Sequence, residues 1–247
     1  ADLPAHELLC CGFPCASFSR AGSMGCDMRL IRHVLSKLAP RTSQCVLLEN
    51  TLNFPTVDGG RAMAEVLDLL RSQGFAHVQH RVVSLAPLTG LPQVRKRWIC
   101  VAQRCAEPAY RFPDPLPKSQ RLVLCDILLA QGKYLECCKI HRGGKPFVTD
   151  RVHRLWQVGC RGANKQNLRI YHRLGLGGTL TSRGAIYVWQ DDSQVRLLTP
   201  RELARCMGYP DTFEIPSGRV VATKLLGRSI PPPLVEAIMR KWEPCGS

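Results

Sequence analysis

The sequence predicts an α/β protein, in which part of a doubly wound sheet is accompanied by a smaller, irregular lobe. Short apolar runs at 8–11, 45–48 and 98–102 are typical of buried strands, and amphipathic segments lie between them. Strands that alternate with helices favour a sheet covered by helices. From about Gln103 to Gln194 the apolar periodicity weakens while Gly, Pro, Arg and His become more frequent, which predicts the irregular lobe.

Apolar residues at helical spacing predict two helices in the first part of the chain. Pro40 ends the first helix and Gly74 closes the second. After Gly74, the segment from Val78 to Leu85 alternates loosely and is predicted to be a further strand. The apolar positions are Leu30, Ile31, Val34, Leu35 and Leu38 in the first helix, and Met63, Val66, Leu67 and Leu70 in the second.

Regular structure is predicted to resume at Thr199. This residue is a typical helix N-cap, Pro200 suits the first helical position, and Glu202 completes a capping box. The chain closes with a second predicted helix in this region. Its apolar face consists of Leu234, Val235, Ile238, Met239 and Trp242.

The charge balance points to a polyanionic partner. The 247 residues include 34 Lys and Arg but only 19 Asp and Glu, a net charge of +15. Nucleic acid or an acidic membrane surface would suit such a protein, although some basic proteins have neither partner. No apolar run approaches the ~20 residues of a membrane span. Between Lys139 and Arg173, nine Lys or Arg face one acid, Asp150, which favours a nucleic-acid surface.

The cysteines are expected to be reduced and intracellular. There are 13, with no Cys-x-x-Cys pair, and the amino terminus lacks the pattern of a signal peptide. A disulfide framework is therefore not expected. Cys137, Cys138 and His141 make a poor zinc site, because adjacent cysteines do not suit tetrahedral geometry and no second ligand pair follows. No metal is expected.

Cys15 is the first candidate for chemistry. The apolar run 8–11 predicts a strand, and Gly12-Phe13-Pro14 ends it, so Cys15 follows the carboxyl end of that strand. Ligands bind at such ends in open α/β sheets. A thiolate there is a strong nucleophile. Taken alone, Cys15 is equally well explained as a small, half-buried cysteine.

Five blocks in order resemble the DNA cytosine-5 methyltransferase family. The resemblance covers nearly the whole chain, and it implies a partial Rossmann-like methyltransferase sheet with a smaller, irregular target-recognition lobe. It also implies a catalytic half at 1–102, a recognition region at 103–194 and a return to the catalytic domain at 195–247. The blocks are Gly12 to Ser19, Leu48 to Asn50, Gln93 to Arg97, Arg196 to Phe213, and Gly227 to Ile230.

The resemblance implies a covalent reaction on cytosine. The Cys15 thiolate would add to carbon 6 of the ring, so that carbon 5 takes the methyl group. Glu49 matches the family's acid near nitrogen 3, and Arg95 and Arg97 match arginines placed against the cytosine and the catalytic loop. Arg97 is expected at oxygen 2. On an extended segment the two arginines point the same way, while Gln93 and Asn50 are expected to hold backbone.

The implied partner is duplex DNA with the target base flipped out of the helix. The loop from Ser17 to about Met28 would close over that base. Gly178 to Thr181 resembles the family's threonine-leucine element. Expected DNA contacts are Ser17, Ser19, Arg154, Arg161, Lys165, Arg169, Thr179 and Leu180.

The implied cofactor is S-adenosyl-L-methionine, held by Pro14, Leu30, Gly227 and Ser229. The family's glycine-rich loop and ribose-binding acid precede the cysteine block, and only a few residues do so here. Arg228 also stands where the family usually has asparagine. The chain is therefore expected to be a fragment, one subunit of a split enzyme that needs a second polypeptide, or an inactive relative. Alone, it is expected to bind the cofactor weakly or not at all.

Two other functions remain open from the sequence. The family's tRNA-methylating branch usually carries a Cys-Phe-Thr element, which is absent here. A non-catalytic DNA-binding or regulatory relative would have no reason to keep Cys15, Glu49, Arg95 and Arg97 together. The expected location is nuclear in a eukaryote and cytoplasmic, at the nucleoid, in a bacterium.

Overall fold

A computed structural model describes residues 6–13, 28–37, 43–105, 110–129, 155, 157–160, 168–184, 186–189, 195–240 and 242. The chain divides into two compact units. The first unit comprises Ala1–Val83, Lys96–Pro113 and Ile238–Ser247. The second comprises Ser84–Arg95 and Asp114–Ala237.

The first unit is built on a mixed four-stranded sheet with the strand order β1-β2-β4-β3. Strands β1 (Leu8–Gly12) and β2 (Cys45–Thr51) are parallel, whereas β2 and β4 (Lys96–Gln103) are antiparallel. Strand β3 (His77–Ser84) lies at the edge beside β4. Each strand includes residues that the apolar pattern assigned to a strand, and the predicted α/β fold is confirmed.

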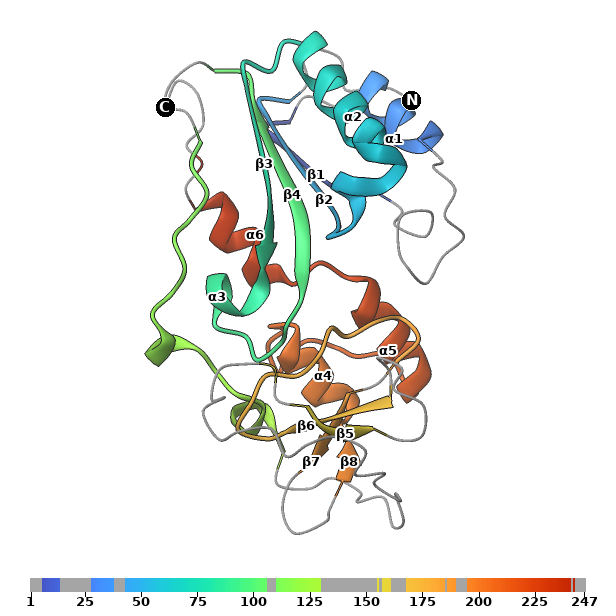
Figure 1. Cartoon of the computed structure of the whole chain (residues 1–247), viewed down its shortest axis with the longest axis vertical. Helices are drawn as coiled ribbons and strands as arrows, with labels where there is room; N and C mark the ends of the chain where they lie inside the picture. The colour runs from blue at the N-terminus through green and yellow to red at the C-terminus, as the bar shows by residue number, and fades with distance from the viewer. Residues whose placement is uncertain are drawn as a thin grey trace. The chain divides into compact units, whose positions relative to one another are not determined.

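Two helices cover one face of this sheet (Figure 1). They are α1 (Arg29–Lys37) and α2 (Arg61–Ser72), and the 3₁₀ segment η1 (Phe54–Gly60) leads into α2. Their apolar sides pack on alternate residues of β2 and β4, as the period of a strand requires. The shared core includes Ile31, Leu35, Val46, Leu48, Val66, Leu70, Trp98 and Cys100.

The second unit contains a small sheet with the strand order β5-β6-β7-β8. Its strands are β5 (Gln157–Cys160), β6 (Arg169–His172), β7 (Tyr187–Trp189) and β8 (Val195–Leu197). The central pair β6 and β7 is parallel, and the two outer pairs are antiparallel. Strands of three or four residues are too short to give an alternating pattern, so the sequence predicted only an irregular lobe here.

Short helices complete the second unit. They are α3 (Leu85–Thr89), α4 (Pro200–Cys206) and α5 (Arg219–Arg228), with 3₁₀ turns η2 (Lys118–Gln120) and η3 (Leu124–Ile127). The predicted start of α4 is confirmed, because Thr199 and Glu202 form the capping box. Helix α6 (Pro232–Met239) runs from this unit into the first. It ends before Trp242, which the sequence had placed on its apolar face.

The two compact units have different boundaries from the predicted functional regions. Helices α4 and α5, expected to return to the catalytic domain, group with the small sheet. Compactness alone does not say which residues read DNA, so the division at residues 102 and 194 remains a prediction. None of the helices in the described part of the chain could span a bilayer, because each is too short or too polar.

One cysteine differs from the reduced state that the sequence favoured. Cys105 is disulfide-bonded, and its partner lies outside the residues that the structure describes. A fold can pair cysteines that are distant in sequence, and spacing alone does not reveal such a pair. The other cysteines in the described ranges are free thiols: Cys10, Cys11, Cys45, Cys100, Cys125, Cys160 and Cys206. Within the same ranges, no three His, Cys, Asp or Glu side chains could hold a metal ion.

Candidate active site

Glu49 and Arg97 form an ion pair on one face of the first unit's sheet. The Arg97 Nε atom lies 2.8 Å from Glu49 Oε1, and each side chain is 12% exposed. In the antiparallel register Glu49 is opposite Ile99, and Arg97 is opposite Thr51. The two residues are therefore diagonal neighbours, close enough for long side chains to meet. Two of the predicted catalytic residues are thus in direct contact.

The end of β1 lies beside this pair. In the parallel register, Gly12 is the partner of Glu49. The next residue, Phe13, is 5% exposed. Its ring packs edge-on against Phe54 at 5.1 Å and Trp98 at 6.5 Å between centroids. This aromatic cluster fixes the chain immediately before the predicted loop.

Several predicted site residues lie outside the described part of the chain. They include the nucleophile Cys15, together with Pro14, Ser17, Ser19, Arg154, Arg161 and Lys165. Of the predicted cofactor residues in the first unit, Leu30 on α1 is described, and its side chain is 50% exposed.

Asn50 follows Glu49 on β2 and is fully buried. Its Oδ1 atom accepts a hydrogen bond of 2.7 Å from the Thr51 backbone N–H. The expectation that Asn50 holds backbone is confirmed.

In the second unit, the segment Gln93–Arg95 contacts the threonine-leucine element. The buried Gln93 side chain accepts a hydrogen bond from Leu180 N–H at 3.0 Å and donates to the Cys206 carbonyl at 3.3 Å. Thr179 Oγ1 donates to the Val94 carbonyl at 2.6 Å. As predicted, Gln93 holds backbone, and it thereby fixes the conformation of Leu180. The Leu180 side chain is fully buried in the core of the second unit, so the expectation that it contacts DNA is wrong for the side chain.

Arg95 is buried, at 2% exposure. Its Nη1 donates to the Leu180 carbonyl at 2.8 Å, and its Nη2 donates to the carbonyls of Ser229 at 2.9 Å and Gly227 at 3.3 Å. The sequence predicted that Arg95 and Arg97 point the same way. This prediction is wrong, because β4 begins at Lys96 and Arg95 therefore lies outside the strand. The Arg95 guanidinium bonds to backbone carbonyls, whereas the Arg97 guanidinium pairs with Glu49.

Arg169, a predicted DNA contact, lies on β6 and is half-buried. Its side chain hydrogen-bonds to Tyr171, whose ring lies under the backbone of the threonine-leucine element. Burial raises the pKa of the Tyr171 hydroxyl, and the positive charge of Arg169 offsets part of that rise. A Cβ added to Gly178 would lie 2.1 Å from Tyr171 Oη, so only glycine fits at this position without rearrangement.

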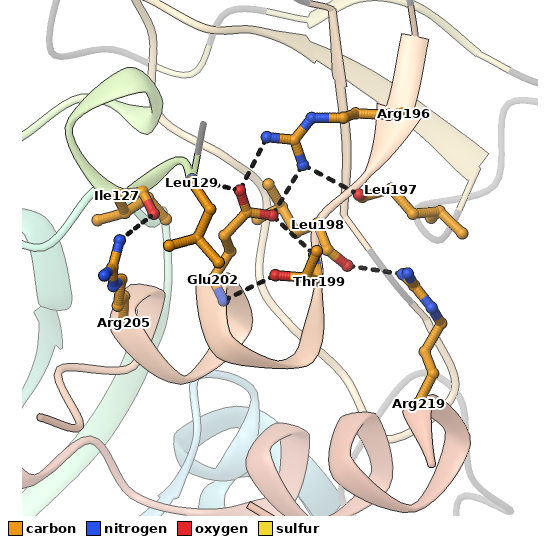
Figure 2. Close-up of polar contacts among 9 residues, drawn as sticks. All are labelled: Ile127, Leu129, Arg196, Leu197, Leu198, Thr199, Glu202, Arg205 and Arg219. Carbon is orange, nitrogen blue, oxygen red and sulfur yellow. Dashed lines mark hydrogen bonds and ion pairs between the residues drawn. The ribbon is translucent and has the colours of Figure 1, made fainter. Parts of the chain in front are cut away.

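A buried ion pair organises the segment around α4 (Figure 2). Arg196 on β8 forms two 2.8 Å bonds with the Glu202 carboxylate, and the side chains are 1% and 0% exposed. The backbone N–H groups of Leu129 and Thr199 each donate to Glu202 at 2.7 Å. Burial alone would raise the pKa of Glu202, but the hydrogen bonds from Arg196, Leu129 and Thr199 bring it below the usual value.

The sequence predicted Glu202 as a helix cap but did not predict its buried ion pair with Arg196. The capping box appears in the sequence as Thr-x-x-Glu, whereas its partner Arg196 lies on a separate strand. Arg196 belongs to one of the five blocks that carried the resemblance, and it lies shortly before the predicted helix start at Thr199. This proximity was the signal in the sequence that could have suggested an ion pair with Glu202.

Comparison with known proteins identifies the family. The model of the C-5 cytosine-specific DNA methylase family matches residues 1–243. The type II methyltransferase M.NlaX of Neisseria lactamica is 30% identical over 98% of this chain and 78% of its own length. The type II methyltransferase M.HhaI of Haemophilus parahaemolyticus is 28% identical over 92% of this chain and 73% of its own.

Solved structures show the same fold. The crystal structure of the S. pombe Dnmt2 methyltransferase matches with a TM-score of 0.66 and 16% identity, over 94% of this chain and 77% of that one. The Entamoeba histolytica methyltransferase EhMeth matches with a TM-score of 0.67 and 12% identity, over 95% and 77%. The fold is that of a methyltransferase. The chain belongs to the C-5 cytosine-specific DNA methylase family, and its reaction is the methylation of cytosine at carbon 5.

Proposed function

We propose that this chain methylates duplex DNA with Cys15 as nucleophile, Glu49 as acid and Arg97 as the cation beside the target cytosine. One observation carries the proposal: Gly12, at the end of β1, is in register with Glu49, which is paired with Arg97. Cys15 follows Gly12 by three residues. A fully extended chain advances about 3.3–3.6 Å per residue, so Cys15 stays within about 11 Å of Gly12.

The chemistry proceeds through a covalent adduct. Glu49 can act as an acid only in its protonated form, so its ion pair with Arg97 opens and the carboxylate takes up a proton from solvent as the base enters. The Cys15 sulfur bonds to carbon 6, and the electrons of the ring double bond move through carbon 5 and carbon 4 onto nitrogen 3, where Glu49 donates that proton. Carbon 5 then takes the methyl group. A base removes the carbon 5 proton, and the double bond returns as the sulfur–carbon bond breaks. The proton on nitrogen 3 goes back to Glu49.

Arg97 favours this sequence electrostatically. Negative charge that develops on nitrogen 3 and oxygen 2 is stabilised by a nearby guanidinium, particularly where the surroundings exclude water. Both side chains of the pair are largely buried but retain 12% exposure, which leaves room for contact with a base. The pair also fixes the orientation of the carboxyl group before the base arrives, and the aromatic cluster around Phe13 holds the adjacent chain.

The methyl donor is S-adenosyl-L-methionine, which supplies an electrophilic methyl group when bound. Among the described residues, the exposed apolar side chain of Leu30 suits contact with an adenine ring. The carbonyls of Gly227 and Ser229 accept hydrogen bonds from Arg95, and Ser229 Oγ donates to the Leu226 carbonyl at 2.9 Å. These two residues therefore shape the cofactor site through their backbone.

A direct assay tests the proposal. Unmethylated plasmid DNA and a tRNA transcript are each incubated with the chain and S-adenosylmethionine labelled in its methyl group. We expect label in 5-methylcytosine of the DNA, none in the tRNA, and none in either with Cys15→Ala. If label appears only when a second polypeptide is added, the chain acts as one subunit of a split enzyme. Label in the tRNA alone would reject the DNA substrate.

A further inference from the structure

The carboxyl end of α5 packs directly against the backbone at the end of the threonine-leucine element. A Cβ added to Gly227 would lie 2.3 Å from the Thr181 carbonyl carbon and 2.5 Å from both Thr181 O and Ser182 N. Real side chains do not tolerate such distances, so two stretches of main chain touch here without a side chain between them. Movement of either stretch would displace the other.

Arg95 bonds both stretches at once. Its guanidinium lies between the Leu180 carbonyl at 2.8 Å and the carbonyls of Ser229 and Gly227 at 2.9 and 3.3 Å. Carbonyls at a helix end lack partners within the helix and carry partial negative charge, which a cation stabilises. The planar fork of arginine can serve acceptors on two sides, whereas a lysine ammonium acts as a compact point charge.

The backbone around Arg95 is held equally firmly. The Arg95 carbonyl accepts a hydrogen bond of 2.8 Å from Leu85 N–H at the start of α3. The neighbouring Val94 donates to the Gly177 carbonyl at 2.8 Å and accepts from Thr179 Oγ1 at 2.6 Å. The guanidinium therefore projects from a fixed position, and a shift of Leu180 reaches the end of α5 through it.

We propose that Arg95 is a positioning residue that links DNA recognition to the cofactor segment, so that DNA bound at Thr179 orders the segment Gly227–Ser229 through the Leu180 backbone. This proposal rests on the DNA role expected for Thr179 from the sequence and on the cofactor role proposed above for Gly227 and Ser229. Arg95 then contributes to the reaction through the segments it holds. Such coupling is reciprocal, and a bound cofactor would favour the DNA-bound arrangement of Leu180 by the same factor.

Amide hydrogen exchange of the full chain, with and without saturating unmethylated plasmid DNA, tests the link. In the native chain we expect DNA to slow exchange by about fivefold or more, both at 177–182 and at 225–229. In Arg95→Lys the protection at 177–182 should remain, and that at 225–229 should fall below about twofold, because one ammonium cannot bond both stretches. Lys224→Met, which removes an exposed cation from α5, should behave like the native chain.

The outcomes separate the link from the proposed function. Protection at 177–182 without protection at 225–229 in the native chain would overturn the link alone, as would full protection at both segments in Arg95→Lys. No protection at 177–182 in the native chain would reject the DNA role of Thr179, and the link with it. If Arg95→Lys does not fold, as judged by exchange in β2 and β4, the comparison of 177–182 with 225–229 in the native chain still tests the link.

Discussion

Glu49 and Arg97 meet across neighbouring antiparallel strands, with 2.8 Å between Oε1 and Nε. The contact joins an acid and a cation that the resemblance placed on the same cytosine. It also lies beside Gly12, where the chain leaves β1 for Cys15.

Glu49→Gln should lower kcat for DNA methylation by about 10²-fold or more, because the amide cannot donate the proton that a carboxylic acid supplies. DNA affinity should stay within about threefold, since the amide retains the shape of the side chain and removes a negative charge. Single-turnover methylation and equilibrium binding to the same plasmid DNA measure the two effects.

Glu65→Gln is the matched control. Glu65 also pairs with an arginine, Arg32, but on the helical surface of the same unit, where the side chains are 34% and 54% exposed. Its substitution should leave kcat unchanged. An equal loss in both variants would mean that Glu49 acts through the stability of the unit.

Arg196→Met should destabilise the protein strongly. It would leave the Glu202 carboxylate buried without its cation, and breaking a buried pair in this way costs about 3–5 kcal/mol. Urea unfolding of the native and variant chains measures the difference. Asp211→Asn, which breaks the exposed pair with Arg205, should change the midpoint little. Equal midpoints for the native chain and Arg196→Met would contradict the structural role.

The same pair should make stability depend on acid. The pKa of Glu202 in the folded protein lies below its usual value, so its contribution is present above the unfolded pKa of about 4.3 and is lost as pH falls through the folded one. As the pH is lowered below ~4.5, the free energy of unfolding should therefore fall less steeply in Glu202→Gln than in the native chain. Parallel curves for the two proteins would show that other carboxyl groups govern acid unfolding.

The basic stretch between Lys139 and Arg173 should govern the salt dependence of DNA binding. Replacing Arg154, Arg161 and Lys165 by alanine should reduce the slope of log affinity against log salt by about 0.9 for each phosphate that the variant no longer neutralises. Arg71→Ala, on α2 and paired with Asp68, is the control and should leave the slope unchanged. An unchanged slope in the triple variant would place this stretch away from the DNA.

Short sequence patterns predicted the strands and helices around the site. The roles of some residues, such as Arg95, depend on contacts with residues that are distant in the sequence. The apolar run before Glu49 and the capping box at Thr199 both correspond to observed elements. The burial of Arg95 was not predictable from alternation, because the strand begins one residue later and its acceptors lie more than eighty residues away in sequence. The strands β5 to β8 are too short for a recognisable pattern.

Covalent trapping tests the central claim most directly. Burial raises the pKa of the nearby thiols Cys10 and Cys11, which makes both weaker nucleophiles than an exposed cysteine. A duplex with 5-fluorocytosine at the methylated position, incubated with the chain and S-adenosylmethionine, blocks the final proton removal and retains the adduct. Peptide mass spectrometry should find the base attached to Cys15, with no adduct in Cys15→Ala and a normal yield in Cys11→Ala. An adduct on another cysteine, or an undiminished yield in Cys15→Ala, would contradict the account.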